Sequence, residues 1–253
     1  MMNPRIDRRW LASWAQTRRR RRALLVPEPP VPVSLLTRLL GYYDFADGSF
    51  ASHAVMDDLV ETEDSAGPPT LGTAPFGWAA FDDANGAQME AGGYWINGYP
   101  FSYTCWMLHN ESTATWVPPF ALFGYGTNQA QVQLVYYDAD SVWAYLVDDF
   151  RNGLGWFGTL ADGLVDDVFH QFTLVFTPDR VAVHVDGQLT GTFAHTTPCP
   201  ALDKLSLGWR WIDWFRQRGN LKVGNIGIWN RALTADEVTQ LYNGGLGLDY
   251  ASL

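Results

Sequence analysis

Short segments in which apolar and polar residues alternate recur along most of this chain. Residues 131–136 (Gln-Val-Gln-Leu-Val-Tyr) and 141–146 (Ser-Val-Trp-Ala-Tyr-Leu) each place every second side chain on one face. Such alternation is typical of strands in a sheet with one buried and one solvated face. The candidate strands are residues 41–45, 77–81, 94–96, 101–108, 120–124, 131–137, 142–147, 155–159, 171–176, 181–185, 190–193, 205–209 and 221–229. We therefore expect an all-β protein with two packed antiparallel sheets.

The C-terminal end of the chain predicts one irregular strand followed by the only helix of the sheet-forming region. Residues 221–229 favour a strand with a glycine-marked irregularity. Thr234 and Glu237, three residues apart, form a capping-box pair that starts a short helix. The inner face of this helix is formed by Val238, Leu241 and Tyr242. The glycines at 244–245 are expected to end it.

Four pieces of sequence follow one another in a recognisable order. An opening strand within residues 34–45 is followed by Phe101–Leu108, and then by a hairpin that ends in Val185-Asp-Gly187. The fourth piece is the strand, Asn-Arg-Ala-Leu turn and capped helix of residues 220–245. This order, which spans about residues 34–250, resembles laminin-G-like domains of the concanavalin A-like type. The resemblance implies a two-sheet antiparallel jelly-roll sandwich with one short C-terminal helix, which binds sugars or proteins rather than catalysing a reaction.

Composition agrees with a sheet protein. Aromatic residues make up 15% of the chain and charged residues only 17%, with 24 Gly and 14 Pro. Aromatic and β-branched runs separated by Gly, Pro, Asn and Asp are typical of short strands joined by turns. A length of 253 residues suits one long β-sandwich, or one domain with an appendage.

The charge is divided between two opposed parts of the chain. Residues 1–40 hold nine arginines against Asp7 and Glu28, a net charge of +7. The remainder holds eight basic and 25 acidic residues, a net charge of −17, so that the whole chain carries −10. A basic arm on an acidic body indicates that the two parts meet different partners.

The basic arm has the pattern of a short amphipathic helix followed by a spacer. Ile6, Trp10 and Trp14 recur at every fourth position and share one helical face. Residues 26–33 (Val-Pro-Glu-Pro-Pro-Val-Pro-Val) favour polyproline II. We therefore expect a docking arm at residues 1–25, a Pro-rich linker at 26–33 and a laminin-G-like domain at 34–253. The arm residues expected to bind a partner are Trp10, Trp14, Arg18, Arg19, Arg20, Arg21 and Arg22.

Two interpretations of the arm are open, a solvated disordered tail and a segment that orders on a partner. The two tryptophans on one face favour the second, with other protein subunits of a larger assembly as the expected partner and nucleic acid as the alternative. No apolar run of about 7–15 residues follows the N-terminal charges, so no secretory signal is expected. No apolar run approaches about 20 residues, so no contact with a membrane is expected.

No constellation of catalytic residues is found. Glycoside hydrolases need two carboxylates about 5–10 Å apart, and the Glu-x-Asp-x-Glu strand pattern that supplies them is absent. The acidic pairs at 82–83, 148–149 and 166–167 are expected in loops or on opposite faces. The five histidines lack zinc-ligand spacing. Cys105 is expected as a buried strand residue and Cys199 in a turn, and whether they pair is left open. We expect no enzyme.

Calcium is an open alternative to the expectation that no metal or cofactor is bound. Asp138 and Asp140 join two candidate strands and would place two carboxylates at one rim of the sandwich. A polar hairpin turn accounts for the same residues without a metal ion, and we favour that interpretation.

The segment at residues 209–219 concentrates aromatic and basic side chains in a predicted loop. Trp209 and Trp211 are expected to fill the core. The ligand-binding candidates are Trp214, Phe215, Arg216 and Arg218. Aromatic rings can stack on sugar faces while arginine meets hydroxyl groups, and the same residue types dominate protein interfaces.

Two functions of different class follow from these observations. The first is a non-enzymatic virion component, a phage capsid-decoration, head-fibre or tail protein, anchored to its assembly by the basic arm. The second is a secreted or cell-surface lectin-like adhesion module that holds glycans at the rim of the sandwich. The lack of an export signal and the basic arm favour the first.

Overall fold

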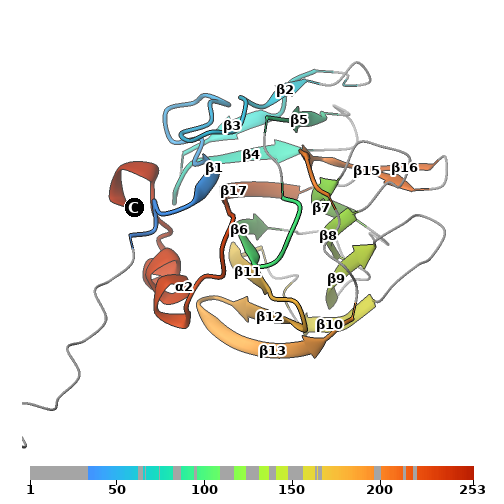
Figure 1. Ribbon diagram of the computed structural model, residues 1–253. Coiled ribbons are helices and arrows are strands. Elements are labelled where there is room, and N and C mark those ends of the chain that lie inside the picture. Colours follow the sequence, from blue (N-terminus) through green and yellow to red (C-terminus); the bar gives the residue numbers. More distant parts are fainter. Residues whose placement is uncertain are drawn as a thin grey trace, which may run out of the picture. The chain divides into compact units, whose positions relative to one another are not determined.

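The computed structural model describes most of the chain beyond the arm. The described residues are 34–253 except 62–64, 66, 74, 82–86, 94–95, 109–116, 124–130, 137–140, 148–155, 163, 165–166, 197–200, 213–214 and 219–220. The chain divides into two units, Met1–Ser34 and Leu35–Leu253, of which the second is compact. The second unit is built from two antiparallel sheets and a C-terminal helical segment (Figure 1). The prediction of an all-β sandwich with one short C-terminal helix is confirmed.

The larger sheet has eight strands in the order β13-β12-β11-β6-β17-β4-β3, with β1 also paired to β17. These strands are β1 (Leu39–Tyr43), β3 (Thr70–Gly72), β4 (Trp78–Phe81), β6 (Phe101–Leu108), β11 (His170–Phe176), β12 (Arg180–Val185), β13 (Gln188–Ala194) and β17 (Leu221–Trp229). One edge of β17 pairs with β6 along its length, while the other pairs first with β4 and then with β1. The gap between β4 and β1 therefore falls at the middle of β17.

The smaller sheet has seven strands in the order β10-β9-β8-β7-β14-β5-β2. They are β2 (Val60–Glu61), β5 (Met89–Ala91), β7 (Val117–Phe123), β8 (Gln131–Tyr136), β9 (Ser141–Val147), β10 (Trp156–Asp162) and β14 (Lys204–Leu207). The strands of two or three residues, β2, β3 and β5, were not predicted because so short a segment carries no periodicity. Of the candidate strand at 94–96, only Ile96 is described, and it forms an isolated bridge with Leu202.

The predicted loop at 209–219 contains a two-stranded ribbon, so the loop prediction was wrong. β15 (Trp209–Ile212) pairs with β16 (Phe215–Arg218), and Trp211 lies opposite Arg216. Trp209, Arg210 and Trp211 alternate with the period of two that favours a strand, but the density of aromatic and basic residues in this segment was interpreted as a loop. The ribbon belongs to neither large sheet and lies beside β7 (Figure 1).

Two hydrophobic clusters hold the second unit together. One fills the space between the sheets, with Tyr103 and Ile228 from the larger sheet and Leu205 from the smaller one. The other lies on the opposite face of the larger sheet, where Trp229 packs with Val238 of the C-terminal helix. The larger sheet is therefore covered on both faces, and its outer face is closed by the end of the chain.

The C-terminal helix α2 (Ala235–Tyr242) begins as predicted. Thr234 Oγ1 accepts a hydrogen bond from Glu237 N at 3.3 Å, and the Glu237 carboxylate accepts one from Thr234 N at 2.8 Å. The helix ends one residue earlier than predicted, because Asn243 rather than a glycine takes the left-handed C-cap conformation at φ 48°. Two short 3₁₀ turns follow, η1 (Asn243–Gly245) and η2 (Tyr250–Ser252).

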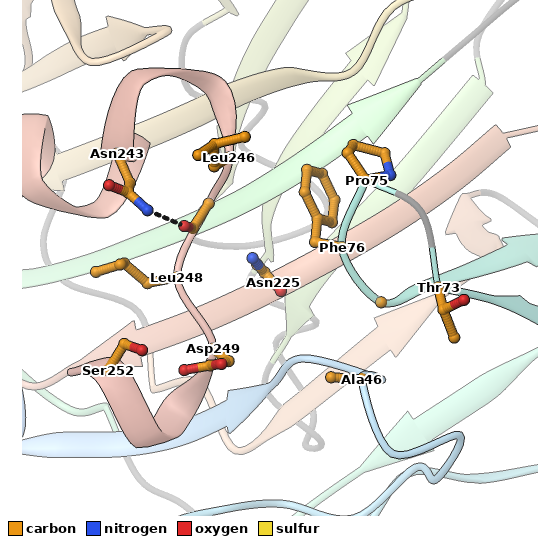
Figure 2. A pocket seen from close by; sticks show the side chains of 12 residues that line it. Ala46, Thr73, Pro75, Phe76, Asn225, Asn243, Leu246, Leu248, Asp249 and Ser252 are labelled. Carbon is orange, nitrogen blue, oxygen red and sulfur yellow. Dashed lines mark hydrogen bonds between the residues drawn. The ribbon is translucent and has the colours of Figure 1, made fainter.

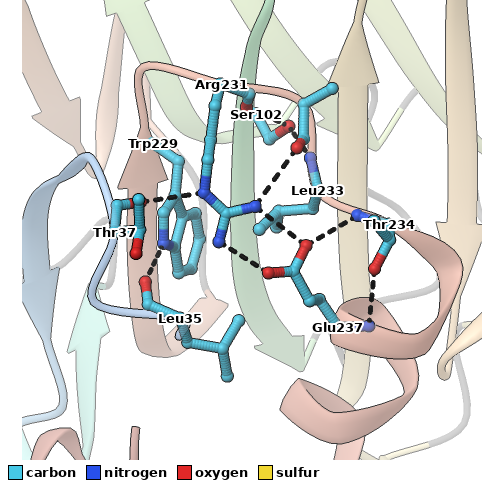
Figure 3. Close-up of polar contacts among 9 residues, drawn as sticks. Leu35, Thr37, Ser102, Trp229, Arg231, Leu233, Thr234 and Glu237 are labelled. Atoms are coloured by element: carbon cyan, nitrogen blue, oxygen red, sulfur yellow. Dashed lines mark hydrogen bonds and ion pairs between the residues drawn. The ribbon is translucent and has the colours of Figure 1, made fainter. Parts of the chain in front are cut away.

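A buried polar network joins the end of β17 to α2 and to β6 (Figure 3). Arg231 donates two hydrogen bonds to the Glu237 carboxylate, at 2.8 and 2.7 Å, and a third to Thr37 O. Ser102 Oγ donates to Arg231 O and accepts from Leu233 N. Hydrogen bonds with β6, with α2 and with the segment before β1 therefore hold the turn between β17 and α2. The Asn-Arg-Ala-Leu sequence of this turn was part of the family resemblance.

Candidate functional site

The middle of β17 is bulged where its two neighbours separate. The pairing of β17 with β6 shifts between Gly224 and Gly227, as the glycine-marked irregularity predicted. Asn225 lies at this bulge with φ 42°, a left-handed conformation that asparagine tolerates better than most residues. The bulge turns the Asn225 side chain into the space beside β17, between the loop that precedes β4 and the C-terminal segment (Figure 2).

That space is a pocket of about 280 Å³, which we call the Asn225 pocket. Its walls come from the turn after β1, the loop before β4, the bulge of β17 and the C-terminal segment after α2. The lining residues are Ala46, Thr73, Pro75, Phe76, Gly77, Asn225, Asn243, Leu246, Gly247, Leu248, Asp249 and Ser252. These residues are far apart in sequence, and the pocket exists only in the folded sandwich.

The Asn225 side chain is buried and has no hydrogen-bond partner. The residue is only 2% exposed, and neither Oδ1 nor Nδ2 is hydrogen-bonded. An unsatisfied buried polar group costs about 1–3 kcal/mol, and nearly all such groups in proteins are paired. Both polar atoms are out of reach of solvent beneath the C-terminal segment, so a ligand could pair with the amide only after that segment had moved.

The wall opposite β17 is held in place by hydrogen bonds of its own. Asn243 Nδ2 donates to Gly247 O at 2.8 Å, and Gly247 N donates to Tyr242 O at 3.3 Å. Tyr42 Oη donates to Leu248 O at 2.6 Å. The C-terminal segment is thus positioned before any ligand binds, and a ligand would spend little binding energy on ordering it.

A buried aspartate fixes the far end of the same segment. Asp44 is 6% exposed, and its Oδ2 accepts a hydrogen bond from Tyr250 N at 3.0 Å. Its Oδ1 lies 3.3 Å from His53 Nε2, and the His53 ring stacks on the Tyr250 ring with centroids 5.0 Å apart. The turn after β1 and the C-terminal segment therefore form one unit beside the pocket.

The chemical character of the pocket is neutral apart from one carboxylate. Among the described residues that line it, Asp249 alone is ionisable, and its side chain is exposed. Thr73, Ser252 and Asn225 add neutral polar groups, and Phe76 adds an aromatic ring that also packs on Trp106. The pocket can therefore exchange hydrogen bonds with a polar ligand, but it offers no cation to an anionic one.

Of the residues predicted to bind a partner or ligand, none that the structure describes lines this pocket. The arm residues Trp10, Trp14, Arg18, Arg19, Arg20, Arg21 and Arg22 lie outside the described residues, as do Trp214, Asp138, Asp140 and Cys199. Phe215, Arg216 and Arg218 lie in β16, where they continue the pairing with β15. The Asn225 pocket was not predicted from the sequence. Its one local signal is an asparagine between two glycines of a strand, and this pattern does not reveal that β1 and β4 leave a gap beside Asn225.

The described part of the chain holds one free cysteine, which lies in the core. Cys105 is a buried free thiol, and burial raises its pKa far above the usual range, which removes the nucleophilic thiolate at neutral pH. No three His, Cys, Asp or Glu residues in this part are grouped so as to hold a metal ion. None of its helices has the length and apolar character needed to cross a membrane.

Comparison with solved structures shows the same fold in domains of several proteins. Domain 4 of AbnA, a GH43 extracellular arabinanase from Geobacillus stearothermophilus solved with arabinotriose, superposes with a TM-score of 0.59 at 14% identity, covering 83% of this chain and 98% of that domain. The botulinum neurotoxin serotype G binding domain gives 0.60 at 11% identity, covering 82% of this chain and 51% of that one. The receptor binding domain of botulinum neurotoxin D gives 0.61 at 10% identity, covering 84% and 54%.

The present chain spans about half the length of the neurotoxin binding domains it matches. No curated protein sequence matches it. A family model described as the concanavalin A-like lectin/glucanases superfamily, of laminin G type, matches residues 81–239, which is more than half of the chain. The matched segment runs from β4 to α2 and contains the bulge at Asn225. The chain therefore belongs to the concanavalin A-like lectin/glucanases superfamily.

Proposed function

We propose that the protein is a non-catalytic carbohydrate-binding module and that the Asn225 pocket is its ligand site. The observation that carries the proposal is the pocket of about 280 Å³, whose lining combines the neutral polar residues Thr73, Asn225 and Ser252 with the aromatic ring of Phe76. Membership of a lectin superfamily supports it, as does the structural likeness to an arabinanase domain solved with arabinotriose.

A sugar suits the pocket because its hydroxyl groups both donate and accept hydrogen bonds. The hydroxyls of Thr73 and Ser252 can both donate and accept hydrogen bonds, and the carboxylate of Asp249 can accept them. The aromatic and aliphatic side chains of Phe76 and Leu248 provide the apolar wall that such sites use to bury the ligand's carbon skeleton. The ligand would thus exchange hydrogen bonds at its hydroxyl groups while keeping its apolar face out of water.

Screening the intact protein on a broad glycan array tests this proposal. We expect at least one glycan to bind, and we expect Asn225→Gly to weaken that binding at least tenfold, because it removes the side chain on which the pocket wall around Gly247 packs. Glycine adopts the left-handed backbone of residue 225 without strain, and removing an unpaired amide offsets lost packing, so the free energy of unfolding should change by less than about 1 kcal/mol. Binding is measured by calorimetry and stability by urea denaturation.

The array also distinguishes the Asn225 pocket from the ligand site that the sequence predicted at Trp214, Phe215, Arg216 and Arg218. Trp214→Ala alters the segment between β15 and β16 and leaves the Asn225 pocket intact. Loss of glycan binding in Trp214→Ala, with full binding in Asn225→Gly, would move the ligand site to the ribbon. Absence of any glycan signal from the intact protein would contradict the carbohydrate-binding function itself.

The charge division favours a second, compatible role as an anchored virion component. The N-terminal 40 residues carry +7 and the remainder −17, which suits a basic arm that docks on other subunits while the acidic sandwich faces outward. We propose that the sandwich is a capsid-decoration, head-fibre or tail module of a phage and that residues 1–33 tether it.

Deleting residues 1–33 tests the tether. The shortened protein should remain folded, because the two hydrophobic clusters and the network around Arg231 lie entirely within residues 35–253. We expect it to be missing from virus particles purified from the source culture, where the full chain should be detected by mass spectrometry. Recovery of the shortened chain in the particles at an undiminished level would refute the tether, and absence of the full chain would refute the virion role.

A further inference from the structure

Residues 246–253, which we call the C-terminal strap, follow the turn after α2 and cover the bulge of β17 (Figure 2). The structure describes all of them, and none is paired in a sheet, so lifting the strap breaks no strand pairing. We propose that the strap opens as a unit while both sheets and α2 stay folded, and that it gates the Asn225 pocket.

The closed strap seals a polar side chain without satisfying it. Asn225 is 2% exposed, and neither Oδ1 nor Nδ2 has a hydrogen-bond partner, although nearly all buried polar groups in proteins are paired. A Cβ atom added to Gly247 would lie 2.4 Å from Nδ2, so the backbone of the strap lies directly on the amide. The backbone groups of Gly247 are engaged elsewhere, its carbonyl by Asn243 Nδ2 and its N–H by Tyr242 O. Water reaches the amide only when the strap lifts, so hydration of Asn225 favours the open form.

The described contacts that oppose this opening are few. Two hydrogen bonds join the strap to the start of the domain: Tyr42 Oη donates to Leu248 O at 2.6 Å, and Tyr250 N donates to Asp44 Oδ2 at 3.0 Å. The Tyr250 ring also stacks on the His53 ring, with centroids 5.0 Å apart. The apolar side chains of the strap are only partly buried against the cluster on the outer face of the larger sheet. A segment held by so few buried contacts opens at a lower free energy than the core strands.

The turn between α2 and the strap has the backbone of a hinge. Four of its residues adopt a left-handed conformation with φ between 48° and 93°, namely Asn243, Gly244, Gly245 and Gly247. Glycine takes positive and negative φ about equally well, so three of the four can change conformation at little cost. Helix α2 ahead of this turn is fixed by the hydrogen bonds between Arg231 and Glu237. The strap can therefore swing about residues 243–247 while α2 stays in place.

Opening takes the Asn225 pocket apart. Several of its lining residues belong to the strap, namely Leu246, Gly247, Leu248, Asp249 and Ser252. The loop before β4 and the bulge of β17, which line the other side, stay with the larger sheet. The pocket therefore exists in the closed form, and a ligand of any chemistry that fills it would hold the strap down. This inference does not rest on the proposed carbohydrate-binding function, and its test uses the protein without ligand.

Hydrogen exchange of the full-length protein tests the opening. Gly247 N and Tyr250 N report on the strap, and the amides that pair β17 with β6 report on global unfolding. Below the unfolding transition we expect the strap amides to be protected at least a hundredfold less than those of β17, and to depend less on urea. Equal protection with equal urea dependence would show that the strap unfolds only with the domain, which would overturn the proposal.

Two neighbouring tyrosines of β1 supply a matched control. Tyr42 and Tyr43 are both buried, and each donates one hydrogen bond of 2.6 Å. The first bond ends on Leu248 O in the strap, and the second ends on Asp57 O outside it. Either change to phenylalanine should speed exchange in β17 about fivefold, the equivalent of one hydrogen bond. Tyr42→Phe should speed exchange of the strap by the same factor, whereas Tyr43→Phe should leave it unaltered, because its bond is kept in the open form. Equal acceleration of the strap in both variants would contradict a separate opening.

Asn225→Asp tests the part that the sealed amide plays. Aspartate keeps the shape and tolerates the left-handed backbone, but its charge cannot be hydrated beneath the closed strap. At neutral pH we expect the strap amides to exchange at least tenfold faster than in the wild type, with unchanged circular dichroism of the sheets. Exchange of the strap at or below the wild-type rate would show that residue 225 does not favour opening. If this variant fails to fold, the two tyrosine variants still decide whether the strap opens.

Discussion

Replacing Arg231 by alanine is expected to lower the free energy of unfolding by about 3–5 kcal/mol, although the residue lies outside the candidate site. Its guanidinium forms two parallel hydrogen bonds with the Glu237 carboxylate, and both side chains are largely buried, with exposures of 12% and 8%. Alanine would leave the Glu237 charge buried without its cation, and Thr37 O would lose its donor. Urea denaturation at neutral pH measures the loss.

Three further variants serve as controls for the loss of stability in Arg231→Ala. Arg180→Ala removes an exposed arginine from β12 and should change stability by less than about 0.5 kcal/mol. Arg231→Lys keeps the charge but loses the planar fork, so it should fall between wild type and alanine. Replacing both Arg231 and Glu237 by methionine should be less harmful than Arg231→Ala, because no unpaired charge remains. A loss of under 1 kcal/mol in Arg231→Ala would show that the pair does not hold α2.

The same pair predicts how the effect of Arg231→Ala depends on pH. Burial alone would raise the pKa of Glu237, but hydrogen bonds from Arg231 and from the backbone of Thr234 outweigh it and lower the pKa below its ordinary value of 4.5. A carboxyl whose pKa is lower in the folded state stabilises the protein above its unfolded pKa, and this stabilisation is lost as the pH falls through the folded value. The difference between wild type and Arg231→Ala should therefore be largest near pH 7 and should shrink below about pH 4.5.

The parts of the fold that were predicted from sequence are those that short-range chemistry specifies. Thr234 and Glu237 satisfy each other's backbone donors within one helical turn, so a pattern of four residues was enough to place the start of α2. The Asp186-Gly187 turn has φ values of 50° and 76°, and a two-residue hairpin turn selects residues that tolerate them. The alternation of apolar and polar residues in β8 and in β9 can likewise be recognised from the sequence of each strand alone.

The Asn225 pocket depends on relations that no short pattern contains. The backbone of β17 lacks a strand partner on one edge at Asn225 because β1 ends and β4 begins on either side of it, and 34 residues separate these two strands. Its opposite wall is the segment around Gly247, which is placed by Tyr42 and Asp44 from the start of the domain. The sequence indicated an irregular strand at this position. The gap between β1 and β4, which makes room for the pocket, became visible only in three dimensions.

Two glycines in the C-terminal segment offer a matched test of how the pocket is built. Gly247 and Gly244 have nearly the same backbone, with φ of 64° and 63°. Alanine at either position adopts a left-handed conformation at a cost of about 1 kcal/mol. A Cβ atom at residue 244 meets nothing within 4 Å, whereas one at residue 247 would lie 2.4 Å from Asn225 Nδ2 and 3.4 Å from Trp106 Nε1.

Gly247→Ala is therefore expected to destabilise the protein by about 2–4 kcal/mol, the sum of backbone strain and overpacking, against about 1 kcal/mol for Gly244→Ala. The Asn225 amide has little room to yield, because it is 2% exposed beneath the C-terminal segment. Where it does yield, the pocket wall that it shares with Gly247 is displaced. Glycan affinity should fall at least tenfold in Gly247→Ala and should persist in Gly244→Ala. Equal affinities and equal urea midpoints for the two variants would mean that the contact between Gly247 and Asn225 does not shape the pocket.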